Sequence, residues 1–201
     1  MKTFKQFIKS HMCDLSSLNE SLLDDEDELA SPVNEVREFL DKIYKCSKEF
    51  EIDDSKDPIR VSTKGRVEIS AKVKNLSELT NGLFEFYETG DFIAWVDLTT
   101  LKGSPRHVHG TFNVCSSKLE SLEGGPEVVD NGYVCAECDS LESLEGAPVK
   151  VPGTFNCSDC WSLKTLKGAP KFVGKDFICE GCIGLKNFRY LPNKVGGSIM
   201  K

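Results

Sequence analysis

Cysteine is the residue type in this sequence with the clearest potential for chemistry. Six of the nine cysteines form three Cys-x-x-Cys pairs: Cys135 with Cys138, Cys157 with Cys160, and Cys179 with Cys182. Eighteen residues separate each pair from the next. This spacing satisfies the pattern of a zinc site built from two such pairs. A zinc-stabilised module is therefore one hypothesis for the chain.

Four residue columns recur at a nearly constant interval through the second half of the sequence. They are Pro105, Pro126, Pro148, Pro170 and Pro192; Leu98, Leu119, Leu141, Leu163 and Leu185; Val108, Val129, Val151, Val173 and Val195; and Phe112, Tyr133, Phe155, Phe177 and Ile199. A unit of this length cannot bury its own apolar side, so neighbouring units must stack. The pattern predicts a solenoid over residues 76–201, with Leu76, Leu79 and Phe92 in a degenerate first unit.

Each unit is predicted to form one coil with one short strand. Phe177 and Cys179 are two residues apart, so both face the same side of an extended segment. Gly168 and Pro170 then turn the chain, and Val173 brings it back toward the core.

The repeat also accounts for the spacing of the cysteines without a metal. The first cysteine of each pair takes the apolar strand position that Val114 fills in the shorter unit. Coils about 4.8 Å apart would spread three equivalent sulfurs over about 9.6 Å. One zinc ion holds its sulfur ligands no more than about 4.6 Å apart. We therefore predict buried structural ladders of cysteine, with zinc at two adjacent pairs, or redox or disulfide chemistry, as the alternatives.

The repeat resembles the leucine-rich repeat family. Phe112-x-Val114-x-x-Ser117-x-Leu119 matches the core spacing L-x-L-x-x-N-x-L of that family. In the longer units one extra residue follows the ladder position, as in Cys182-Ile183-Gly184-Leu185. The resemblance implies a leucine-rich-repeat-like α+β solenoid with short parallel strands.

The part of the sequence before Leu76 differs from the repeats in charge and in pattern. Residues 1–60 hold 15 acidic against 9 basic side chains, and residues 24–28 are an unbroken acidic run. Apolar residues at helical spacing predict an amphipathic segment over residues 1–20, followed by an acidic linker over residues 21–31.

Ser31 and Pro32 begin a helix predicted to reach about residue 48. Alternating residues around Lys64-Gly65 predict a hairpin. Helix and hairpin together predict an N-terminal cap over residues 32–75.

Some phrases of the sequence resemble proteins of large bacteriophages with contractile tails. The repeat phrases "LESLEGAP" and "GTFNC" are similar to a repeat type in those phages, and "MKTFKQFI" is similar to the start of proteins packed into their heads. In that family a prohead protease removes an N-terminal targeting segment after Leu/Ile-x-Glu. The resemblance implies cleavage after Leu18-Asn19-Glu20 and a location in the virion head, the host cytoplasm, or both.

Composition and motifs argue against several classes of function. A net charge of −7 gives no attraction for nucleic acid, and no apolar run is long enough for a membrane span. The glycines follow the repeat and form no phosphate-binding loop, and the G-x-S-x-G signature is absent. His107 and His109 flank Val108, so we expect both to face solvent. We predict no catalytic residue, no enzymatic activity and no cofactor.

The predicted binding surface is the outward face of the strands with its acidic rim. Exposed apolar residues with two tryptophans suit a protein partner, and solenoids use such faces for binding. The candidate residues are Ile93, Trp95, Asn113, Val134, Glu137, Asn156, Asp159, Trp161, Ile178 and Glu180.

The leading functional hypothesis is a non-enzymatic protein-binding repeat module of phage type that acts on a host or virion protein. The alternatives are a structural internal head protein and the zinc-stabilised Cys-x-x-Cys module.

Overall fold

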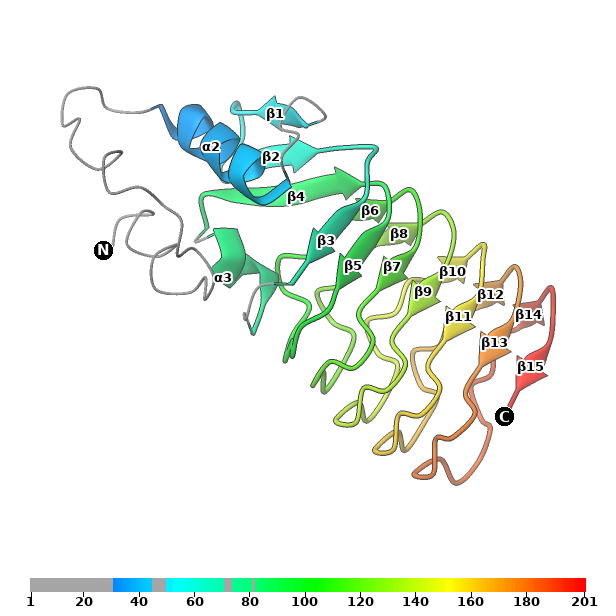
Figure 1. Cartoon of the computed structure of the whole chain (residues 1–201). Helices are drawn as coiled ribbons and strands as arrows, with labels where there is room; N and C mark the ends of the chain where they lie inside the picture. Colours follow the sequence, from blue (N-terminus) through cyan, green and yellow to red (C-terminus); the bar gives the residue numbers. More distant parts are fainter. Residues whose placement is uncertain (1–30, 45–49, 71–73, 81) are drawn as a thin grey trace.

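The computed structural model describes residues 31–44, 50–70, 74–80 and 82–201. Within these ranges the chain forms a β-solenoid of about six turns, with parallel strands and two helices. Figure 1 shows the coils following one another along a single axis, from β2 and β3 to the C-terminal strands. The predicted targeting segment, residues 21–30 of the linker and the cleavage site Leu18-Asn19-Glu20 lie outside the described residues.

Each described coil contains two short strands that belong to opposite faces of the solenoid. The first strands are β2 (Ile59–Ser62), β4 (Phe84–Thr89), β6 (His107–Val108), β8 (Val128–Val129), β10 (Lys150–Val151), β12 (Phe172–Val173) and β14 (Lys194–Val195). The second strands are β3 (Val67–Ile69), β5 (Phe92–Ala94), β7 (Phe112–Asn113), β9 (Tyr133–Val134), β11 (Phe155–Asn156), β13 (Phe177–Ile178) and β15 (Ile199–Met200). The second strands form one continuous seven-stranded sheet.

The prediction of one strand per coil is wrong. Val173 does not merely return the chain to the core, because it lies in β12 and pairs in parallel with β10 and β14. The valine column thus lies in the first strand of each coil, on the face opposite the aromatic column. No helix occurs in the described residues after α3 (Leu76–Thr80), so the α+β character expected of the repeat is not confirmed.

The predicted stacking of apolar columns is confirmed. Phe112, Tyr133, Phe155 and Phe177 are fully buried, and their ring centroids follow one another at 5.1, 5.4 and 5.6 Å. Parallel pairing keeps them in register, with Phe155 opposite both Tyr133 and Phe177. Contacts between the rings add to the burial of apolar area, so this column forms the centre of the core.

The N-terminal end of the solenoid is covered by α2 (Pro32–Tyr44) and by β1 (Glu51–Asp53), which pairs antiparallel with β2. Val36, Phe39 and Leu40 of α2 are buried, and the Phe39 ring lies 5.3 Å from that of Phe84. The predicted helix start is therefore confirmed. Residues 45–48 of the predicted helix lie outside the described residues.

The predicted hairpin at Lys64-Gly65 is wrong. Strand β2 pairs in parallel with β4, and β3 pairs in parallel with β5, so the two strands on either side of this turn do not pair with each other. They are the two strands of the first coil, and the repeat begins before residue 76. No helix in the described part of the chain has the length and apolar character needed to cross a membrane.

Candidate functional site

The predicted strand-face residues lie in one column, as expected. Ile93, Asn113, Val134, Asn156 and Ile178 occupy equivalent positions in successive strands of the seven-stranded sheet, and all are half-buried. The two asparagines are engaged locally, since their Oδ1 atoms accept hydrogen bonds from the backbone N–H groups two residues later, at 3.1 and 2.9 Å. The apolar positions of this face are therefore interrupted by amides.

The three predicted members of the acidic rim are exposed. Glu137 and Asp159 occupy the same turn position of successive coils, and both have a φ of 57°. Glu180 precedes that turn position by one residue, because Gly181 takes it in the next coil with a φ of 71°.

The two tryptophans are exposed but do not form a common anchor. Trp95 is 51% exposed and its Nε1 donates a hydrogen bond to Glu68 Oε1 at 3.0 Å. Trp161 is 58% exposed. The first follows β5 and the second follows β11, so three coil spacings, about 14 Å in all, separate them along the axis. Trp161 instead shares its repeat position with Ile183 of the next coil, which is also exposed.

The paired cysteines form buried ladders that hold neighbouring coils together. The thiols of Cys160 and Cys182 donate to the carbonyl oxygens of Cys135 and Cys157 at 3.2 and 3.1 Å. Ser117 fills the same position in an earlier coil, and its hydroxyl donates to the Val96 carbonyl at 3.0 Å. The predicted structural position of the second cysteine, facing backbone groups of the neighbouring coil, is confirmed.

Three of these thiols are poorly suited to bind zinc or to react, whereas a hydrogen bond with Cys157 lowers the pKa of Cys182. Burial raises the pKa of Cys135 well above its usual value, and contact with another thiol, followed by burial, raises the pKa values of Cys157 and Cys160. Only the thiolate is a good ligand or nucleophile. Among the described residues, the one group that brings three potential ligand atoms within 4.8 Å of one another contains no cysteine.

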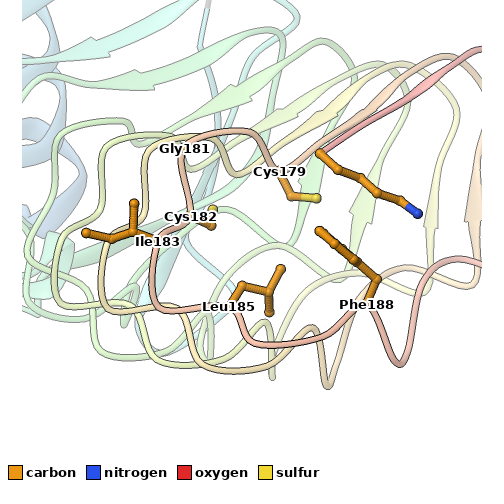
Figure 2. Close-up of a pocket in the computed structure, with 7 residues that line it drawn as sticks. Cys179, Gly181, Cys182, Ile183, Leu185 and Phe188 are labelled. Atoms are coloured by element: carbon orange, nitrogen blue, oxygen red, sulfur yellow. The ribbon is translucent and has the colours of Figure 1, made fainter.

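The last coil forms a surface that the sequence reasoning missed, and we call it the open end. A shallow hollow there is lined by Cys179, Cys182, Leu185 and Phe188 (Figure 2). Lys201 also lines it, and its Nζ lies 4.7 Å from the centre of the Phe188 ring. Several further apolar side chains are exposed in the same coil: Ile183, Tyr190, Ile199 and Met200. A contiguous exposed apolar surface of this kind is typical of a binding site.

The open end is also basic. Residues 161–201 carry eight Lys and Arg against two Asp and Glu, a net charge of +6, whereas residues 113–160 carry two against nine, a net charge of −7. Some of this charge is paired between coils, as in Lys164 with Glu142 and Lys167 with Glu145. No acidic residue occurs after Glu180, so the last coil has no acidic side chain to pair with its own basic ones.

The backbone of the open end can accept a further strand. In the seven-stranded sheet, the N–H groups of Phe177 and Cys179 donate to the carbonyls of Ser198 and Met200 in the following coil, both at 2.9 Å. Ile199 and Lys201 occupy the corresponding positions in the last coil, so their N–H groups point to where the next strand would lie. Strand β15 is the edge of its sheet and β14 the edge of the opposite one. Such edges are templates for pairing with another chain.

Comparison with family models, with curated proteins and with solved structures finds no match to this chain. The geometry and charge of the molecule itself are therefore the basis on which a function is proposed.

Proposed function

We propose that this chain is a non-enzymatic protein-binding solenoid whose open end binds an extended acidic segment of a partner protein. The main support for this proposal is the contrast between the two ends of the solenoid. Helix α2 and strand β1 cover the N-terminal end, whereas the last coil exposes apolar side chains, edge strands and basic groups. This combination suits β-augmentation, in which backbone hydrogen bonds give affinity and side-chain pockets give specificity.

The basic charge of the open end indicates the class of partner. A second copy meeting this one end to end through the same surface would bring two basic coils together, which is unfavourable. An acidic segment would instead meet Lys186, Arg189, Lys194 and Lys201, while its apolar side chains covered Leu185 and Phe188. Trp161 and Ile183 extend the apolar surface to the side of the open end.

Binding of a short fluorescein-labelled peptide of alternating Glu and Leu, followed by fluorescence anisotropy, tests the proposal on the full chain. We expect Ile199→Pro to raise the Kd at least about tenfold, because proline removes one outward N–H and blocks the edge. Lys194→Glu should weaken binding by a similar factor.

Lys118→Glu is the matched control, since Lys118 lies in the acidic part of the solenoid and forms an ion pair with Asp97 at 3.5 Å. It should leave the affinity unchanged. Equal binding of a peptide of alternating Lys and Leu, or an unchanged Kd in Ile199→Pro, would refute an acidic strand partner at the open end.

The setting we propose is the head of a large bacteriophage, from which the protein is delivered to the host. The support is the resemblance of "MKTFKQFI" and of the repeat phrases to proteins of such phages. The relation to leucine-rich repeats is part of the same proposal. It is supported by the spacing of Leu163 and Leu166 and by the ladder position, whereas two strands per coil depart from that pattern.

The packaging proposal predicts a defined mature N-terminus. Mass spectrometry of purified virions should find the protein beginning at Ser21, because cleavage after Glu20 would release the targeting segment. Virions that contain the chain with Met1 still present, or that lack the chain altogether, would contradict this prediction.

A further inference from the structure

Three polar residues on one face of the solenoid lie in three successive coils. Glu88 lies in β4, His109 follows β6 and Asp130 follows β8. His109 and Asp130 occupy corresponding places, because β6 and β8 pair in register just before them, whereas Glu88 is paired with His107. His107 lies two residues before His109, with buried Val108 between them, so both imidazoles extend from the outer side of the same strand.

The four side chains form one connected cluster. Asp130 Oδ2 lies 2.8 Å from His107 Nε2 and 3.1 Å from His109 Nδ1, so a single carboxylate oxygen contacts both rings. The other nitrogen of the second ring, His109 Nε2, lies 3.2 Å from Glu88 Oε2. The two ring centroids are 4.0 Å apart. Burial opposes ionisation of Asp130, but hydrogen bonds from both histidines dominate and lower the pKa of its carboxyl group.

This arrangement has the donor set of a transition-metal site. Glu88, His107 and His109 each place one ligand atom within 4.8 Å of the other two, which no other group of the described residues does. Zinc binds nitrogen and oxygen ligands at about 2.1 Å, so its ligand atoms are at most about 4.2 Å apart. Partly exposed side chains can close a difference of this size by small rotations.

The chemistry of the ligands selects the kind of ion. Two imidazoles and one carboxylate suit Zn²⁺ and neighbouring transition metals, whereas Ca²⁺ and Mg²⁺ prefer oxygen ligands alone. Asp130 matches the outer carboxylate that accepts the second N–H of a metal-bound histidine. Its contacts with His107 Nε2 and His109 Nδ1 leave the opposite nitrogen of each ring available to the ion.

The cluster opens onto a hollow lined by Glu51, Ser62, Thr63, Lys64, Glu88 and His109. Three protein ligands leave a fourth position of a tetrahedral ion unfilled, and water from this hollow can take it. We propose that Glu88, His107 and His109 bind one Zn²⁺ ion, with Asp130 orienting both imidazoles. The ion would join two successive coils directly and a third through Asp130.

Isothermal titration calorimetry tests the site. Zinc chloride is added to the chelator-treated full chain under reducing conditions. We expect one ion per chain, with a Kd in the micromolar range or below. His109→Ala should raise that Kd at least about thirtyfold. Asp130→Asn should raise it about tenfold, as loss of an outer carboxylate does, and should keep the stoichiometry.

Cys160→Ser is the control that separates this site from zinc at the cysteines, and it should leave the Kd unchanged. The Co²⁺ complex should lack the charge-transfer band of a thiolate ligand. Circular dichroism should show every variant folded, because the replaced cluster side chains are partly exposed and because serine already fills the repeat position of Cys160 at Ser117. Unchanged zinc binding in His109→Ala, loss of binding in Cys160→Ser, or a wild-type Kd above about 100 µM would each overturn the proposal.

Discussion

Phe155→Ala is expected to lower the free energy of unfolding by about 4 kcal/mol. The Phe155 ring is fully buried and stacks on Tyr133 at 5.4 Å and on Phe177 at 5.6 Å. Truncation removes the transfer free energy of the ring and leaves a cavity between two coils. The coils on either side cannot close this cavity, because their backbones are hydrogen-bonded in register. Urea denaturation followed by circular dichroism measures the loss.

Two substitutions in the neighbouring coils separate the effect of burial from the loss of an aromatic ring as such. Phe172→Ala makes the same chemical change on the outer side of β12, where the ring is only half-buried and Lys150 and Lys194 lie 5.7 Å from its centre. It should cost less than about 1 kcal/mol. Tyr133→Phe should leave stability unchanged or raise it by about 1 kcal/mol, because the buried Tyr133 hydroxyl has no hydrogen-bond partner among the residues that the structure describes. Equal losses in Phe155→Ala and Phe172→Ala would show that the stack is not the core.

The core of the solenoid could be predicted from the sequence because stacking requires the same residue type at the same place in every coil. Phe112, Tyr133, Phe155 and Phe177 keep one phase, and the structure places them in one buried column. The strands of the valine column could not be found in this way. Each of them after β4 has one apolar residue in the repeat phase, such as Val173, and a single residue shows no alternation, whereas Phe177 is followed two residues later by the apolar Cys179.

The false hairpin has a related cause. Lys64-Gly65 joins two extended segments by a tight turn, and local sequence does not distinguish a turn between paired strands from a turn between two faces of one coil. The pairing partners of β2 and β3 are β4 and β5, which lie one full coil further along the chain. Only the extension of the repeat to residues before Leu76 would have revealed them.

The histidine cluster was within reach of the sequence but was not found. The repeat places His109 and Asp130 at the same place in neighbouring coils, by the same step that relates Phe112 to Tyr133, whereas Glu88 is paired with His107. We expected His107 and His109 to face solvent, and their side chains are 29% and 38% exposed. Their carboxylate partners were missed because the repeat was applied to apolar positions alone.

Gly146→Ala is the second substitution for which we expect a large loss of stability, about 3 kcal/mol. Gly146 has a φ of +95°, which L-residues with a Cβ rarely adopt. A Cβ at this position would also lie 2.2 Å from the Glu123 nitrogen and 2.3 Å from the Leu122 carbonyl carbon, both backbone atoms of the preceding coil. The coils would have to move apart where Leu144 and Leu122 pack in the core.

Gly124→Ala is the matched control for the close approach of the coils at Gly146. Gly124 holds the same repeat position with a φ of +82°, but its nearest new contact would be 3.2 Å, to the Lys102 nitrogen. The backbone strain is thus similar in both variants, so Gly124→Ala should cost only about 1 to 2 kcal/mol. Tyr190 occupies this position in the last coil with a φ of 66°, which indicates that the strain alone is tolerated. The difference between the two alanine variants in urea denaturation therefore measures the close approach of coils, and equal losses would mean that backbone conformation, rather than coil spacing, selects glycine here.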